Sequence, residues 1–111
     1  MIYISGPITK DPNYRLKFRA AAEQLKLRGY DVINPAELAD VLPAEHLSHE
    51  EILFTCKHLI LQCDALVTLP GWEQSLGCQR EVGFAEGADL IVLPVEELLK
   101  KLTKTVKNIL T

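Results

Sequence analysis

The chain has 111 residues, 48% of them apolar and 24% charged, with a formal net charge of -3. This length favours a single domain over residues 1–111, and the composition excludes a disordered chain. The acidic balance lacks the positive charge with which proteins bind polymeric nucleic acid, so no such partner is expected. Apolar stretches fall far short of the roughly 20 residues that cross a bilayer, and no export signal precedes the first apolar run. We therefore expect no membrane partner and a cytoplasmic location.

Four short apolar runs predict β-strands, because each is rich in β-branched or aromatic residues and is followed by a turn signal. In chain order they cover residues 1–4, 30–33, 65–69 and 89–93. The turn Ser5-Gly6-Pro7 ends the first run. Asn34-Pro35 ends the second, since proline lacks the next backbone donor.

Four other stretches carry apolar residues at helical spacing. In chain order they cover residues 13–28, 48–62, 75–87 and 94–109. Gly29 fits a left-handed residue after the first helix, and Ser48 with Glu51 forms a capping box at the second. Ser75 is a good N-cap for the third, and Pro94 suits the first turn of the last.

Strands that alternate with helices predict a three-layer α/β fold with a mostly parallel sheet, flavodoxin-like or Rossmann-like. Such sheets bind ligands at the carboxyl ends of their strands. In this chain that edge carries Ser5-Gly6-Pro7, Asn34-Pro35 and the loop 70–75. Residues 35–47, with about one helical turn at 36–41, form a long connection of the kind that often covers a site.

The stretch from Ser75 to Ala85 offers the clearest chemistry. A helix N-terminus with a serine hydroxyl beside it is suited to phosphate. Glu81 lies about 9 Å further along the axis at ~1.5 Å per residue, and its side chain leans back over Gly77, which leaves room for a ligand. A plain helix cap, a solvated glutamate and close packing at Gly77 and Gly83 explain the same residues. The local pattern leaves both interpretations open.

Three further residues are ambiguous from sequence alone. Tyr3 lies on the first strand, and its phenol either fills the core or reaches the sheet edge. Trp72 either stacks on a planar ligand or pins its loop to the core. Asp64 precedes the third strand at the opposite edge of the sheet, where geometry makes it an ordinary turn residue.

Cofactor and metal motifs are missing. The chain has no GxGxxG, P-loop lysine or GxSxG motif, and its histidines lack the spacing of a two-histidine metal site. Cys56, Cys63 and Cys78 fit neither a disulfide framework nor a zinc site, so we interpret them as reduced thiols. No cofactor and no metal are expected.

The combination of Tyr3-Ile-Ser-Gly-Pro-Ile8, Asn34-Pro35, Cys63-Asp64 and the stretch from Ser75 to Ala85 resembles the nucleoside 2-deoxyribosyltransferase superfamily. The similarity extends over about residues 1–93. Within the superfamily it is greatest to small phage and bacterial members and to the 2'-deoxynucleoside 5'-monophosphate N-hydrolases. The resemblance implies a cytoplasmic enzyme of nucleotide metabolism that forms a homodimer or a larger assembly.

The resemblance also implies residue roles. Glu81 matches the nucleophile that attacks C1' of deoxyribose, expels the base and forms a glycosyl ester, with overall retention. Tyr3 matches the tyrosine that orients it, and Ser5 and Gly6 match a loop that holds the sugar phosphate. Asp64 matches an acid that helps to protonate the leaving base, which disagrees with its expected position at the opposite edge.

The position six residues before the nucleophile distinguishes the substrates within the superfamily. Transferases of free nucleosides carry aspartate there and the monophosphate hydrolases carry serine, as Ser75 does here. A hydroxyl at a helix N-terminus can donate to a phosphate that an aspartate would repel. Lys10 lies near the place of the hydrolases' usual arginine. Cleavage of 2'-deoxynucleoside 5'-monophosphates is the first expectation; a transferase on free nucleosides and a non-catalytic nucleotide-binding module are the alternatives.

Overall fold

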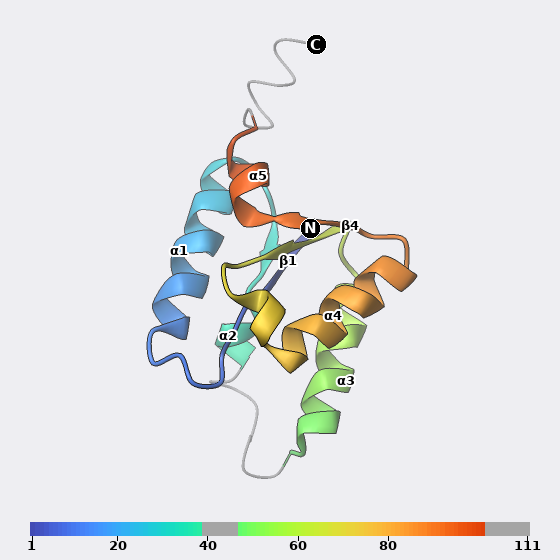
Figure 1. The fold of residues 1–111 in the computed structure, drawn as a ribbon. Coiled ribbons are helices and arrows are strands. Elements are labelled where there is room, and N and C mark those ends of the chain that lie inside the picture. The colour runs from blue at the N-terminus through green and yellow to red at the C-terminus, as the bar shows by residue number, and fades with distance from the viewer. Residues whose placement is uncertain (39–46, 102–111) are drawn as a thin grey trace.

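A computed structural model describes residues 1–38 and 47–101 of the chain. Its strands are β1 (Ile2–Ser5), β2 (Val32–Ile33), β3 (Ala65–Thr68) and β4 (Ile91–Pro94). Its helices are α1 (Tyr14–Leu27), α2 (Pro35–Leu38), α3 (His49–Ile60), α4 (Leu76–Gly87) and α5 (Val95–Leu99), with a short 3-10 helix, η2 (Trp72–Gln74), before α4. Figure 1 shows the strands in the middle of the molecule with helices on both sides.

The four strands form one parallel sheet in the order β2-β1-β3-β4, which confirms the expected three-layer α/β fold. Tyr3 of β1 lies beside Ile33 of β2 and beside Leu66 of β3. From β1 the chain first runs outward to β2 and then returns to β3 on the other side. The carboxyl ends of β1 and β3 therefore form the switch point, the place at which doubly wound sheets bind their ligands.

The side chains of β1 alternate between two separate cores. Ile2 and Ile4 face α1 and α5 and pack with Phe18. Tyr3 faces α3 and α4 and packs with Val82. Both cores exclude water: Phe18 is 1% exposed and Tyr3 is 0% exposed. The strand thus carries one set of residues toward each face of the sheet.

Several predicted helix ends are confirmed. Ser48 and Glu51 make the reciprocal bonds of a capping box at α3, and the Ser75 hydroxyl accepts from the backbone N–H of Cys78 at α4. Gly29 follows α1 with a φ of +89°, a conformation that favours glycine.

Several predicted boundaries were wrong. β1 includes Ser5, because its backbone continues the pairing with Thr68. Part of the loop 70–75 is the helix η2. The last helix ends at Leu99, since the backbone N–H of Lys101 turns to the carbonyl of Leu98 in a tighter bond. The described part of the helical turn expected at 36–41 belongs to α2. Residues 39–46 of the predicted loop and residues 102–109 of the predicted last helix lie outside the described residues.

Glycine is required at one point beside the sheet edge. A Cβ added to Gly6 would lie 2.7 Å from Cδ1 of Leu69, which is closer than side-chain carbons approach. Gly71 has a φ of +87° and lies next to the Pro7 ring. The loops that follow β1 and β3 therefore pack closely together at the carboxyl edge of the sheet. Within the described residues, no helix has the length and apolar character to span a membrane.

Candidate functional site

The Glu81 carboxylate is held at both oxygens by side chains of β1. The Tyr3 hydroxyl donates a 2.7 Å hydrogen bond to Oε2, and the Ser5 hydroxyl donates a 2.7 Å hydrogen bond to Oε1. Tyr3 and Ser5 are two residues apart on one strand, so their side chains point to the same face of the sheet. We call this arrangement of Tyr3, Ser5 and Glu81 the carboxylate clamp. It joins the carboxyl end of β1 to the first half of α4.

The sequence of α4 explains why Glu81 points inward. Cys78, Val82 and Ala85 are the buried residues of this helix and define its inner face. Glu81 lies beside Val82 at the border of that face, and helical side chains lean toward the N-terminus. The carboxylate therefore reaches back toward the edge at which β1 ends.

Burial dominates the electrostatics of the clamp. It raises the pKa of Glu81, and the hydrogen bonds from Tyr3 and Ser5 oppose this by stabilising the charged carboxylate. Burial and the neighbouring Glu81 raise the pKa of the Tyr3 hydroxyl far above its usual value. Tyr3 therefore keeps its proton at any physiological pH and acts as a donor. A partly buried carboxylate with a perturbed pKa at the carboxyl edge of a parallel sheet is typical of functional sites.

Two thiols that the sequence did not single out adjoin the clamp. Cys56 of α3 interacts with both the Tyr3 hydroxyl and the Glu81 carboxylate, and burial raises its pKa. Cys78 is 2% exposed and interacts with Ser75 and Ser5, and burial raises its pKa too. Both are free thiols, as expected, and at neutral pH both keep their proton. The sequence could have indicated these neighbours of the clamp, because the helical spacing places both cysteines on the inner faces of their helices.

Ser75 and Gly77 form an open helix N-terminus near the clamp. Ser75 is partly exposed, and its hydroxyl oxygen accepts from the Cys78 backbone at 3.3 Å, which leaves the hydroxyl proton available. A Cβ added to Gly77 would meet only the Ser75 hydroxyl, at 4.0 Å, and one added to Gly83 would meet nothing within 4 Å. Close packing therefore does not explain Gly77 or Gly83.

The remaining predicted residues of the loops have packing roles in this structure. Trp72 is partly buried and packs against the core that contains Tyr3, so the loop is anchored beside the clamp. Gly6 packs against Leu69, and Pro7 against Gly71. Lys10 is exposed, with a φ of +72° in the turn before α1.

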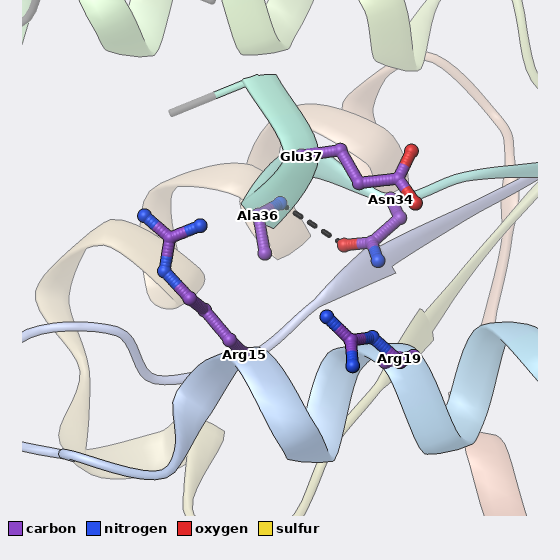
Figure 2. Close-up of a pocket in the computed structure, with 5 residues that line it drawn as sticks. All are labelled: Arg15, Arg19, Asn34, Ala36 and Glu37. Atoms are coloured by element: carbon purple, nitrogen blue, oxygen red, sulfur yellow. Dashed lines mark hydrogen bonds between the residues drawn. The ribbon is translucent and has the colours of Figure 1, made fainter. Parts of the chain in front are cut away.

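Asn34 lies at the same edge of the sheet but on the other face. Its side chain lines a pocket together with Arg15 and Arg19 of α1, as Figure 2 shows. Its Oδ1 accepts from the backbone N–H of Ala36 at 3.0 Å and so caps the start of α2. The structure therefore does not bring Asn34 together with Glu81.

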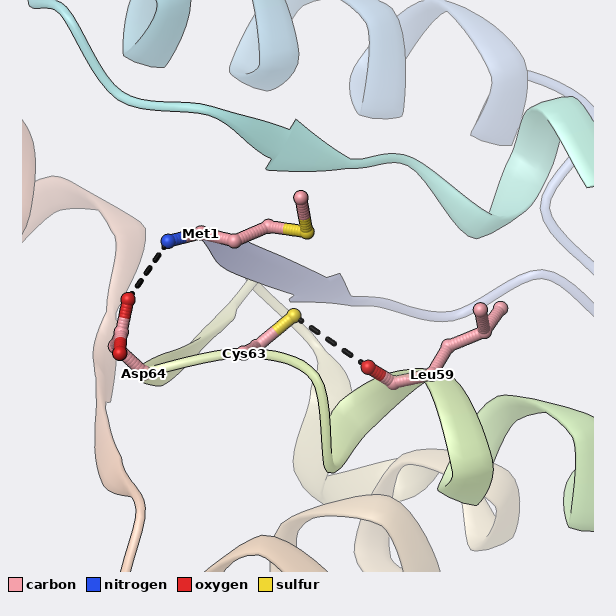
Figure 3. A network of polar contacts seen from close by, with 4 residues as sticks. All are labelled: Met1, Leu59, Cys63 and Asp64. Atoms are coloured by element: carbon pink, nitrogen blue, oxygen red, sulfur yellow. Dashed lines mark hydrogen bonds and ion pairs between the residues drawn. The ribbon is translucent and has the colours of Figure 1, made fainter.

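Asp64 lies at the amino edge of the sheet, away from the clamp. Its Oδ2 pairs with the N-terminal ammonium group of Met1 at 2.8 Å, and its side chain is 87% exposed (Figure 3). Its backbone N–H also donates to the Met1 carbonyl. Beside it, the Cys63 thiol donates to the carbonyl of Leu59 at 3.6 Å. Within a single chain, Asp64 is not near Glu81.

A comparison with protein-family models matches residues 1–93 to the domain of unknown function DUF4406. The match includes every residue of the clamp and all four strands up to Leu93. The chain belongs to the DUF4406 family. A comparison with curated proteins gives no match.

The position of Asp64 in this DUF4406 domain leads to a first prediction. Because the Asp64 carboxylate is exposed and pairs with the N-terminal ammonium group at the amino edge, Asp64→Asn is expected to change the free energy of unfolding by at most about 1 kcal/mol. Any glycosidase activity should stay within about twofold of wild type. Urea denaturation and initial rates measure the two effects. A loss of activity without a loss of stability would instead place Asp64 in a site, contributed from another chain.

Proposed function

We propose that this DUF4406 domain cleaves the N-glycosidic bond of 2'-deoxynucleoside 5'-monophosphates, with Glu81 as the nucleophile. The observation that carries the proposal is the carboxylate clamp. A partly buried carboxylate, oriented by two donors at the switch point of a parallel sheet, suits attack on a bound ligand. The proposal also accords with the resemblance of the sequence to the nucleoside 2-deoxyribosyltransferase superfamily.

The chemistry has two displacements. A Glu81 oxygen forms a bond to C1' as the C1'–N bond breaks, and the electron pair of that bond leaves with the base, which takes up a proton. Water then attacks C1', the bond to Glu81 breaks, and the proton of the water is released. Two inversions give retention, and the carboxylate also stabilises the positive charge that develops on the sugar.

Tyr3 and Ser5 are positioning residues in this mechanism. Their hydrogen bonds favour the ionised carboxylate against the burial that raises its pKa. Each carboxylate oxygen of Glu81 accepts one hydrogen bond and has a further lone pair that is not used by Tyr3 or Ser5. The nucleophile is therefore held in orientation while it keeps electron density for attack.

The assay that tests the proposal measures base release from nucleosides and from 5'-monophosphates, with and without an added acceptor base. Wild type is expected to release base and deoxyribose 5-phosphate from deoxynucleoside monophosphates without an acceptor. Product that depends on an acceptor base would assign deoxyribosyl transfer instead. Binding of the nucleotide without any product would assign a non-catalytic module and contradict the proposal.

Ser75 carries the expected preference for phosphorylated substrates. Aspartate caps a helix as well as serine does, so Ser75→Asp should fold normally. Its carboxylate repels a phosphate at the helix N-terminus, and KM for monophosphates is expected to rise by about tenfold or more. KM for free nucleosides should stay unchanged. Steady-state kinetics with a nucleoside and its monophosphate provide the comparison. An equal effect on the two KM values would show that the substrate phosphate does not bind at Ser75.

Assembly and location form the last part of the proposal. Large apolar side chains are exposed on and next to α3 and α4, among them Phe54 at 75% and Leu76 at 60%. Their exposure favours the homo-oligomer that the resemblance implies. A cytoplasmic location follows from the sequence argument and from the nucleotide substrate.

A further inference from the structure

A polar pocket lies on the opposite face of the sheet from Glu81. It has a volume of about 50 Å³ and lies between α1 and α2. Figure 2 shows its lining: Arg15, Arg19, Asn34, Ala36 and Glu37. This volume suits a small ion and is too small for a nucleoside.

Asn34 contributes an unused donor to this pocket. The residue is 8% exposed, and its Oδ1 already caps α2. Among the residues that the structure describes, nothing accepts a hydrogen bond from its Nδ2. No described side-chain nitrogen or oxygen is both inaccessible and unpaired, so this Nδ2 must reach the open space of the pocket. A buried amide donor without an acceptor costs free energy that a ligand oxygen would recover.

The charge of the lining favours an anion. Arg15 and Arg19 are four residues apart on α1, so two like charges share one face of the helix at some cost. Within the described part of the chain, the Arg19 guanidinium has no ion-pair or hydrogen-bond partner. Among the described lining residues Glu37 is the one acid, and it forms no ion pair with Arg19. Arg19 therefore brings to the lining a permanent positive charge that no described acid pairs with.

We propose that this pocket binds a small oxyanion of the phosphate class, independently of the Glu81 site. The Arg19 guanidinium can match two oxygens of phosphate with parallel donors, and the Asn34 amide adds a neutral donor. The pocket is open to solvent, so the anion is either free phosphate or the end group of a larger molecule that extends outward. The proposed glycosidase function does not enter this argument.

The experiment is a titration of the whole chain with inorganic phosphate at constant ionic strength, followed by ¹⁵N-resolved NMR. Wild type is expected to show saturable shifts at the Asn34 side-chain amide and at the Arg19 Nε–H. Arg19→Gln should weaken binding by about tenfold or more. Arg80→Gln is the matched control, because it makes the same change at an exposed arginine on α4. It should leave the affinity unchanged.

Asn34→Asp tests the amide without disturbing the fold. The new carboxylate still accepts from the Ala36 backbone, so the α2 cap is retained while the donor is replaced by a negative charge. Saturable binding of phosphate should be abolished in this variant. Shifts in wild type that grow linearly without saturation, or equal affinity in Arg19→Gln and Arg80→Gln, would overturn the proposal.

Two further arms separate the possible sources of the anion. If inorganic phosphate saturates the pocket and phenyl phosphate does not, the ligand is the free ion. If phenyl phosphate saturates it as well, the pocket accepts the end group of a phosphate monoester. Glu81→Gln should bind phosphate as wild type does. A loss of phosphate binding in Glu81→Gln would contradict the independence of the two sites, whereas a failure of base release would leave phosphate binding intact.

Discussion

Replacement of Glu81 by glutamine is expected to lower base release from a deoxynucleoside monophosphate by on the order of 10³-fold or more. Glutamine has nearly the same shape, and its amide can still form hydrogen bonds with the hydroxyls of Tyr3 and Ser5. It has no negative charge with which to form a bond to C1'. Single-turnover chromatography of the products measures the effect, and Arg80→Gln serves as a control on the same helix. Equal base release from wild type and Glu81→Gln would exclude Glu81 as the nucleophile.

The same substitution is expected to stabilise the fold at neutral and higher pH. Burial raises the pKa of Glu81 in the folded protein, so the folded state holds its proton more tightly than the unfolded state does. The stability of wild type is therefore complete below the ordinary pKa of glutamate and falls as the pH rises through the folded pKa. Glutamine does not titrate, so Glu81→Gln avoids this loss.

Urea denaturation at two pH values measures this linkage. At pH 8, the free energy of unfolding of Glu81→Gln should exceed that of wild type by on the order of 1 kcal/mol. The difference should shrink as the pH falls well below the ordinary pKa of glutamate, where Glu81 is protonated in both states. A difference that does not depend on pH would mean that Glu81 ionises in the fold as easily as in water.

Replacement of Tyr3 by phenylalanine is expected to give the second-largest effect. The ring stays in its buried position, and one of the two clamp donors is lost. Fewer donors to the carboxylate mean a still higher pKa of Glu81, so the acidic limb of the kcat/KM profile should move to higher pH. At neutral pH the activity should fall by about tenfold to a hundredfold.

A matched variant separates positioning from structure. Tyr14→Phe removes the same hydroxyl on α1, where the ring packs edge-on against Phe18 on the other face of the sheet. Its pH profile should match that of wild type. A general loss of stability would lower kcat in both variants without moving the acidic limb. An unchanged limb in Tyr3→Phe would show that Tyr3 does not tune the nucleophile.

Sequence patterns predicted the layers of this fold better than its contacts. Apolar runs and helix caps are local, so the parallel sheet, the α3 capping box and the turn at Gly29 could be predicted directly. Within the described residues, α5 ends at Leu99, although the apolar spacing of the sequence continues beyond it. Spacing describes a possible helix face and does not say where the backbone bonds stop.

The clamp could be predicted only in part. Tyr3 was ambiguous between core and edge, and in the structure both descriptions hold, since its ring is buried and its hydroxyl donates to Glu81. The contact of Ser5 with Glu81 spans 76 positions along the chain and depends on how α4 packs on β1. The sequence placed Asn34 in one site with the other residues of the carboxyl edge, because that prediction did not distinguish the two faces of the sheet. Alternation along β2 decides that face.

The two donors of the clamp lie on a single short strand in the middle of the sheet, where neighbouring strands pair with it on both sides. A backbone paired in this way has little freedom to shift, and the Glu81 side chain has already given up its rotamer freedom before any ligand arrives. The ordering of the reactive group is part of the cost of folding, so binding need not supply it again. Such a site lowers the stability of the ligand-free protein slightly, and in return its reactive carboxylate is already oriented when the ligand binds.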